Sequence, residues 1–251
     1  MSVLPKLKRY GQVTKRLPRE IVLLRGSGCF WGKCIFCDYH LDQGSSAFRN
    51  YKLNTEALKK VTGKYGILQV INSGSTSELD VCTVFEIMKL CREKGIKQII
   101  FESHVRYEDN IKLFKERFYP IELKFIVGAE TFDVDYRENV LNKDIGPRKA
   151  WDFKNFDWVN LLFGMQGQSL EKLESDVKLA LKYFERVTVN IFCENTTKVK
   201  RDNELVEKFY NSELFKTLQT TYYNRVEVLD DIDPRCDADL DGVGGKINEQ
   251  N

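Results

Sequence analysis

The chain has 251 residues, of which 42% are hydrophobic and 30% are charged, and its formal net charge is +2. This composition is typical of a soluble globular protein. The nearly neutral charge argues against a general nucleic-acid-binding surface, so nucleic acid is not an expected partner. No apolar run approaches the roughly 20 residues of a membrane-spanning helix, and the N-terminal region has no apolar segment of a secretory signal. We therefore expect a cytoplasmic protein without a membrane partner.

The length of the chain favours a single domain over residues 1–251, because α/β barrels of this size commonly fold as one unit. Residues 1–20 form a basic N-terminal segment, which we expect to be solvated; an arm that contacts phosphate is the alternative. Its basic residues are Lys6, Lys8, Arg9, Lys15, Arg16 and Arg19. Residues 232–251 are rich in acidic residues and glycine. Their DADLDG stretch matches the opening of an EF-hand loop, but the twelfth position is Asn248, so we interpret this region as an acidic tail.

Seven apolar, β-branched segments of strand length alternate with longer amphipathic segments. The predicted strands are residues 21–26, 67–74, 97–104, 123–130, 158–166, 186–192 and 225–231. The clearest helical patterns are residues 77–95 and 168–184, where apolar residues recur on one stripe. Strands that alternate with helices predict parallel βα units joined by right-handed crossovers. Six or seven such units form a full or partial barrel.

Polar residues or glycines follow these strands repeatedly, and in a barrel of this kind the functional site lies at the carboxyl ends of the strands. The residues concerned are Asn72, Ser73, Gly74, Ser75, Glu102, Ser103, His104, Gly128, Glu130, Gly164, Gln166, Asn190, Asn195, Asp230 and Asp231. We expect them to surround one mouth of the barrel. His104 is a candidate general base there, although a lone histidine is more often a structural residue.

Three cysteines, Cys29, Cys34 and Cys37, follow the first predicted strand with the spacing C-x4-C-x2-C. In a reducing compartment, thiols at such short spacing are more often metal ligands than disulfide partners. One interpretation is a zinc site with His40 as the fourth ligand. The other is a [4Fe–4S] cluster held by three cysteines, which leaves one iron open. We favour the cluster, because a closed zinc knuckle is usually a separate small module.

The cysteine segment resembles the signature C-x3-C-x-aromatic-C of the radical S-adenosylmethionine (SAM) superfamily. Phe36 stands in the aromatic position, and one extra residue separates Cys29 from Cys34. The resemblance continues through residues 72–75, which are similar to the glycine-rich segment that receives the methionine amino group, with Ser75 where the family often has glutamate. Residues 102–106 are similar to the end of the family's third strand.

The resemblance also assigns expected roles further along the chain. Glu130 ends a segment similar to the family's fourth strand and is implied as a ribose contact, and residues 159–169, with Gln166, are similar to the fifth strand that flanks the adenine. The implied fold is a partial (β/α)6 TIM-like barrel of the radical SAM type. The implied cofactors are a [4Fe–4S] cluster and SAM; a reducing electron donor is the implied partner. Their chemistry is the formation of a 5′-deoxyadenosyl radical that abstracts hydrogen from a substrate.

Within the superfamily, the chain most resembles members that break a carbon–nitrogen bond in a 7-deazaguanine compound, which implies a small deazapurine as the substrate. Recognition of its base edge requires a carboxylate, and we expect one of Asp230 and Asp231 to supply it. The expected substrate contacts are Arg25, Asn190, Asn195, Asp230 and Asp231, with Glu102 and His104 as candidate catalytic residues. The alternatives are a radical SAM enzyme that modifies tRNA or another small molecule, and a zinc-knuckle module that binds RNA.

Overall fold

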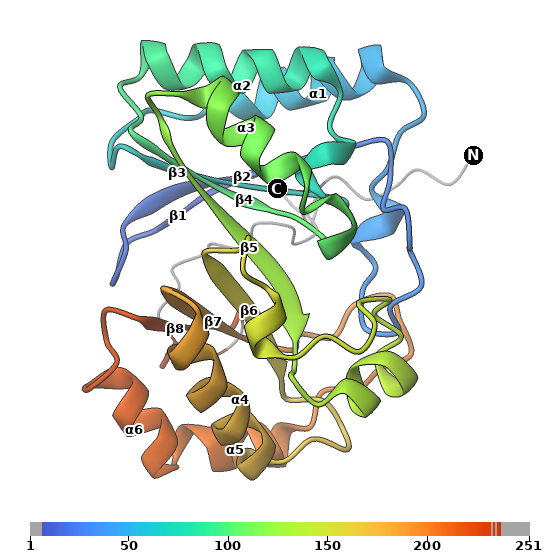
Figure 1. The fold of residues 1–251 in the computed structure, drawn as a ribbon, viewed down its shortest axis with the longest axis vertical. Helices are drawn as coiled ribbons and strands as arrows, with labels where there is room; N and C mark the ends of the chain where they lie inside the picture. The colour runs from blue at the N-terminus through green and yellow to red at the C-terminus, as the bar shows by residue number, and fades with distance from the viewer. Residues whose placement is uncertain (1–6, 232, 234, 237–251) are drawn as a thin grey trace, which may run out of the picture.

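The computed structural model describes residues 7–231, 233, 235 and 236, and it contains one curved sheet of eight strands in chain order (Figure 1). The strands are β1 Tyr10–Val13, β2 Arg19–Leu24, β3 Ile67–Asn72, β4 Gln98–Glu102, β5 Glu122–Glu130, β6 Trp158–Phe163, β7 Arg186–Ile191 and β8 Val226–Leu229. β1 is antiparallel to β2, whereas β2 to β8 are all parallel. The seven predicted strands and the predicted partial barrel are confirmed.

The helices lie outside the curved sheet, with α1, α2 and α3 against one half and α4, α5 and α6 against the other (Figure 1). They are α1 Ala47–Leu58, α2 Val81–Glu93, α3 Asn110–Phe118, α4 Leu170–Tyr183, α5 Asn203–Tyr210 and α6 Glu213–Gln219. Five of these six begin after a Ser or Asp whose side chain accepts a backbone N–H of the first turn, which satisfies a donor that the helix itself leaves unpaired. α2 and α4 confirm the two predicted helical patterns.

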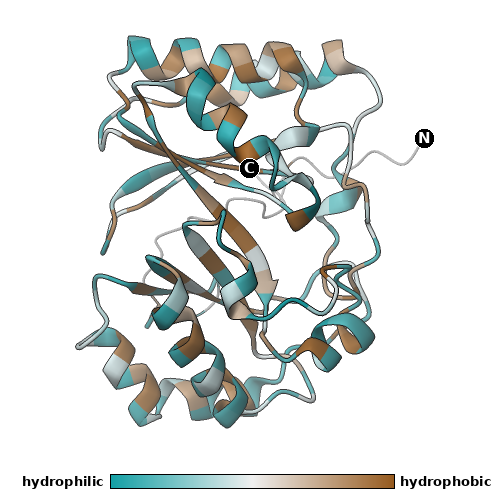
Figure 2. Ribbon diagram, in the orientation of Figure 1, coloured by the Kyte–Doolittle hydropathy of each residue, from teal (hydrophilic) through white to brown (hydrophobic). Residues whose placement is uncertain are grey.

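The two faces of the sheet differ in chemistry. Side chains on the outer face, such as Val70, Phe101 and Val189, join the main hydrophobic core with the helices. Figure 2 shows strands with many hydrophobic residues and helices along which hydrophobic and hydrophilic residues alternate. Residues two apart along a strand share a face. On the inner face, such residues form small apolar clusters together with polar side chains. Polar side chains are therefore gathered inside the barrel.

In the described part of the basic N-terminal segment, residues 7–20, Arg9 and Arg19 are buried rather than solvated as expected. β1, which the sequence analysis missed, pairs with β2, and Arg9 is buried with both guanidinium nitrogens on the carboxylate of Asp42, at 2.7 and 3.0 Å. Arg19 is 1% exposed and makes a bidentate pair with Glu227 of β8, at 2.7 and 3.1 Å. The expectation was wrong because these charges have buried carboxylate partners that are distant in sequence.

Arg19 belongs to a polar layer that fills the amino end of the barrel. Glu227 also accepts hydrogen bonds from Arg186 and Thr188 of β7, and Arg19 Nε donates to the Gln69 side-chain oxygen at 2.7 Å. A buried charge pair is tolerated only when its remaining donors and acceptors are satisfied, as they are here for Glu227. This layer connects the two ends of the open sheet and forms a floor beneath the mouth.

Within the described ranges, no helix is long and apolar enough to cross a membrane. The predicted acidic tail lies outside the described residues, apart from Asp233, Arg235 and Cys236.

Candidate active site

The cysteine loop follows β2 at the carboxyl ends of the strands, and neighbouring segments hold it from two sides. On one side, the indole nitrogen of Trp31 donates to the carbonyl of Asn142 at 2.6 Å, and the Asn142 amide donates back to the carbonyl of Lys33 at 2.9 Å. On the other side, the Asn195 amide donates to the carbonyl of Phe36 at 2.7 Å. Asn195, expected to contact substrate, is exposed and makes this contact with the cysteine loop.

The three thiols are half-buried and close enough to influence one another's ionisation. Burial, opposed by nearby Lys143 and assisted by the charges of Cys37 and Cys29, raises the pKa of Cys34 to about 12. Burial also raises the pKa of Cys37. In the described part of the chain, no three His, Cys, Asp or Glu side chains are already arranged to hold a metal ion. Cys34 and Cys37 are therefore held as thiols, and the positive charge of bound iron would stabilise their thiolate forms.

The segment after β3 lies directly against the cysteine loop. Ser73 Oγ accepts a hydrogen bond from the Gly26 N–H at 3.0 Å. At Gly74 a Cβ atom would lie 3.0 Å from the Cα of Cys29, so only glycine permits this approach. Asn72 donates to the carbonyl of Ser75 at 2.9 Å, but its buried Oδ1 has no partner among the described residues. A narrow glycine cradle with an unused buried acceptor fits an ammonium group of a bound ligand.

Glu78 connects these two segments and was missed by the sequence analysis. One carboxylate oxygen accepts hydrogen bonds from the Phe30 N–H at 2.8 Å and the Tyr107 hydroxyl at 3.1 Å, and the other accepts from the Ser75 N–H at 2.5 Å. Its only signal in the sequence is weak: Glu78 follows a serine by three residues and completes a capping box.

His104 packs behind the cysteine loop. Its ring meets the ring of Phe30 edge to face at 4.9 Å, its Nδ1 accepts from the Arg106 N–H at 3.2 Å, and its Nε2 lies 3.4 Å from the carbonyl of Lys143. Burial and the charge of Lys143 lower its pKa to about 4, so the ring is neutral near pH 7. Its backbone N–H donates to the hydroxyl of Ser75 at 2.9 Å.

Glu130 ends β5 in a left-handed backbone conformation, with φ of 64°, at an irregularity in the pairing with β6. Its carboxylate forms an ion pair with Lys143 at 2.6 Å. Lys143 also lies 5.4 Å from the ring centroid of Phe36, so it joins the ribose candidate to the cysteine loop. Burial alone would lower the pKa of Lys143, but the negative charges of Glu130 and Cys34 raise it. Lys143 was not predicted.

Glu102 ends β4 inside the barrel. Its carboxylate lies 3.4 Å from the Asn160 amide nitrogen of β6, and it also receives a hydrogen bond from Gln69. Burial and the charge of Glu130 raise its pKa to about 7. Asn160 and Gln69 were not singled out from the sequence, although each is a polar residue on one face of an apolar strand.

The predicted substrate contacts are placed in different environments. The Asp230 carboxylate is buried, paired with Arg201 at 2.7 and 3.1 Å, and accepts the Tyr210 hydroxyl at 3.0 Å. Asp231 is exposed, and Asn190 is half-buried in register with Leu229 of β8. The Arg25 guanidinium binds Asp42, with Nη2 and Nε at 2.7 and 2.8 Å. Gln166 is exposed beyond the end of β6.

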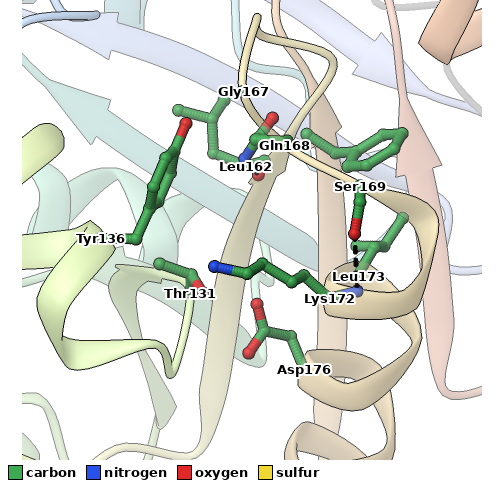
Figure 3. Close-up of a pocket in the computed structure, with 10 residues that line it drawn as sticks. Thr131, Tyr136, Leu162, Gly167, Gln168, Ser169, Lys172, Leu173 and Asp176 are labelled. Carbon is green, nitrogen blue, oxygen red and sulfur yellow. Dashed lines mark hydrogen bonds between the residues drawn. The ribbon is translucent and has the colours of Figure 1, made fainter.

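A small pocket lies beside the expected adenine-flanking segment. Its lining includes Leu162 and Gln168 from that segment, Thr131 and Tyr136 from the chain after β5, and Lys172 and Asp176 from α4 (Figure 3). Gln168 stabilises the turn, because its amide accepts from the Met165 N–H at 3.0 Å and donates to the carbonyl of Leu162 at 2.8 Å. Gln168, rather than Gln166, therefore fixes the backbone at this strand end.

A parallel half-barrel with three thiols on its first βα loop, and with polar strand ends around the same mouth, defines the radical SAM class of enzymes. Comparison with solved structures agrees. The chain is similar to queuine lyase from Clostridium spiroforme, a structure bound to SAM and queuine, with a TM-score of 0.82 and 40% identity over 89% of this chain and 96% of that chain. The chain therefore belongs to the queuine lyase family of radical SAM enzymes. The predicted superfamily is thereby confirmed.

Two further similarities are more distant. SuiB from Streptococcus suis shares 14% identity and a TM-score of 0.55 over 83% of this chain and 49% of that chain, which is a likeness of fold. An uncharacterized protein of Methanocaldococcus jannaschii is 28% identical over 147 residues, 49% of this chain, and the chain spans 38% of that curated relative's length. No protein-family model matches the chain.

Proposed function

We propose that this protein is a queuine lyase, which uses a [4Fe–4S] cluster and SAM to release 7-aminomethyl-7-deazaguanine from queuine in the salvage of that base. One observation carries the proposal: the 40% identity, over nearly all of its length, with a queuine lyase bound to SAM and queuine. The cysteine loop and the polar barrel interior support it independently. The proposal places the reaction in a single domain in the cytoplasm, where free thiols such as the seven in this chain stay reduced.

Cys29, Cys34 and Cys37 hold the cluster in this proposal. The cluster and SAM together supply an electron and a carbon-centred radical that removes hydrogen from the substrate. A separate electron donor provides the reducing power. The chain fixes the loop by the contacts from Asn142, Asn195 and Glu78, so the thiols are positioned by the segments that follow three separate strands.

Asn72, Ser73, Gly74 and Ser75 hold the methionine end of SAM. The unpaired Asn72 Oδ1 and the glycine cradle beside Cys29 support this placement. Glu130 binds the ribose hydroxyls, with its carboxylate fixed by Lys143. Phe36 packs at the base of the loop, and residues 162–168, including Gln166, flank the adenine.

The substrate lies in the barrel interior between the SAM segment and β8. Asp231 is the candidate for the guanine-like edge, because the Asp230 carboxylate is already bound by Arg201 and Tyr210. Asn190 supplies an amide from the neighbouring strand. Arg25 orients the start of the cysteine loop through Asp42, and His104 supports the loop through Phe30.

The test is an incubation of the reduced, reconstituted enzyme with SAM and queuine, followed by mass spectrometry. We expect 5′-deoxyadenosine and 7-aminomethyl-7-deazaguanine to appear together. Formation of 5′-deoxyadenosine only at its queuine-independent rate, without the aminomethyl base, would remove the lyase proposal and leave the radical SAM family membership unchanged.

A further inference from the structure

Glu102 is placed to meet a ligand inside the barrel. It lies two residues after Ile100, which belongs to the interior cluster with Ile126 and Trp158, so the Glu102 side chain shares that inner face. It is half-buried at the carboxyl end of β4, and its strand partner on β5 is Ile126. A carboxylate in this position is reached from the mouth but surrounded by the barrel wall.

The Glu102 carboxylate is supported by neutral amides instead of a cation. Asn160 faces it at 3.4 Å, and Gln69 donates to it from β3. Arg19 Nε holds the Gln69 oxygen at 2.7 Å, so the Gln69 amide group is oriented with its nitrogen available to Glu102. In the described part of the chain, no Lys, Arg or His side chain lies within ion-pair distance of Glu102, since the nearby Lys143 is paired with Glu130.

A residue without a side chain lies beside this carboxylate in the barrel wall. Gly128 of β5 is the strand partner of Asn160, and it separates the strands that carry Glu102 and Asn160. A Cβ at Gly128 would meet Glu130 Oε1 at 2.8 Å and Lys143 Nζ at 3.1 Å. The Glu130–Lys143 pair therefore takes the space that a side chain at position 128 would need, and Glu102 and Asn160 face each other beside it.

The ionisable side chains nearest to Glu102 leave one negative charge that a single cation can neutralise. With both carboxylates ionised, Glu102, Glu130 and Lys143 sum to one negative charge. On the floor, Arg19, Arg186 and Glu227 sum to one positive charge, and both guanidinium groups are engaged by the Glu227 carboxylate. A buried carboxylate without a cationic partner is costly, and a ligand that brings an ammonium group removes that cost.

We infer that Glu102 binds the protonated side-chain amine of the deazaguanine substrate, with Asn160 and Gln69 as positioning residues that orient its carboxylate. This inference rests on the proposed function, and it assigns the reacting nitrogen, rather than the base edge, to Glu102. The base edge is then left to Asp231 on β8. Glu102 then binds the nitrogen of the carbon–nitrogen bond that the reaction breaks. The diol ring lies on the carbon side of that bond.

The experiment compares two ligands that differ in the charge of the side chain. Binding of 7-aminomethyl-7-deazaguanine, which is cationic, and 7-cyano-7-deazaguanine, which is neutral, is measured by calorimetry at pH 8 on the SAM-loaded, unreduced holoenzyme. Glu102→Gln keeps the shape but removes the charge. We expect this variant to weaken binding of the cationic ligand by about tenfold to a hundredfold. Its affinity for the neutral ligand should change by less than about threefold.

Two further variants complete the test. Glu116→Gln, an exposed carboxylate on α3, should leave both affinities unchanged. Glu102→Asp retains the charge at a shorter reach and should give an intermediate loss for the cationic ligand alone, which keeps the test informative if Glu102→Gln folds poorly. Equal losses for both ligands, or no loss for either, would overturn the assignment of the amine. If the unaltered enzyme bound neither deazaguanine, the proposed function would fail and this inference with it.

Discussion

The carboxylate of Glu78 accepts a hydrogen bond from the backbone N–H of Phe30 at 2.8 Å, and this bond joins the segment after β3 to the residue that follows Cys29. The same carboxylate accepts from the Ser75 N–H at 2.5 Å. Because Glu78 is only 9% exposed, little water can reach these two N–H groups to take the place of its carboxylate as their acceptor. Glu78 therefore sets the spacing between the first cysteine and the segment proposed to hold methionine.

Replacement of Glu78 by alanine should destabilise the protein and loosen the cysteine loop. It leaves buried N–H groups on Phe30 and Ser75 without an acceptor, which we expect to lower the free energy of unfolding by about 2–4 kcal/mol. Urea unfolding of the apoprotein measures this loss, and iron per chain after reconstitution should fall as well. Glu93→Ala, at the exposed end of α2, is the matched control and should change stability by less than about 0.5 kcal/mol. Full iron content and unchanged stability in Glu78→Ala would show that the bond does not position the loop.

The regular part of the fold could be predicted from the sequence, because most of the parallel strands are short β-branched segments followed by an amphipathic helix. β1 could not, since Tyr10–Val13 has little apolar character of its own and becomes a strand by pairing with β2. The same limit explains Arg9 and Arg19. Their partners are 33 and 208 residues away, so a local excess of positive charge looked like a solvated segment.

The candidate site was predictable to a different extent for each residue. The cysteines stand out by spacing and the strand ends by polarity. Lys143 has no such signal, and it lies at the cysteine loop next to Asn142, whose carbonyl accepts a hydrogen bond from Trp31. Asp230 and Asp231 are adjacent in the sequence and have different environments, which depend on where Arg201 lies. Asn160 was recognisable in principle, as a polar residue within the apolar strand 158–163.

The cysteine loop discriminates between an iron–sulfur cluster and zinc. Cys29→Ala, Cys34→Ala and Cys37→Ala should each abolish cluster assembly, because each removes one of three thiolate ligands. His40→Ala should keep about four irons per chain, and Cys82→Ala, at an exposed position on α2, is the control. Anaerobic purification with iron and zinc analysis measures all five variants. A colourless protein with one zinc per chain that is lost in His40→Ala would establish the zinc site instead.

Asp230 and Asp231 should separate stability from binding. Asp230→Asn leaves the buried Arg201 guanidinium without its carboxylate, and we expect a loss of about 3–5 kcal/mol in the free energy of unfolding. Asp231→Asn changes an exposed side chain and should alter the free energy of unfolding by less than about 0.5 kcal/mol. The same variant should weaken binding of 7-cyano-7-deazaguanine by about tenfold. Chemical denaturation and calorimetry of the two variants test this. Undiminished ligand affinity in Asp231→Asn would remove that residue from the base edge.

The raised pKa of Glu102 makes the stability of the ligand-free protein depend on pH in a defined direction. In the folded protein its pKa is about 7, against a model value of 4.5, so the folded state holds the proton more tightly than the unfolded state does. The free energy of unfolding contributed by this group is therefore complete below about pH 4.5 and is lost as the pH rises towards 7, by on the order of 2 kcal/mol. Glu102→Gln has no proton to lose, so its stability relative to the unaltered protein should increase between pH 5 and pH 8.

The difference between the two proteins is the quantity to measure, because His104 has the opposite effect in both. Its pKa is lowered to about 4, so its contribution is lost as the pH falls from 6.5 towards 4 and cancels when the curves are subtracted. Urea unfolding at pH 5, 6, 7 and 8 gives the difference curve. A curve that is flat across this range would mean that Glu102 titrates normally in the folded protein, with its carboxylate already compensated, and would contradict the uncompensated charge on which the amine-binding assignment depends.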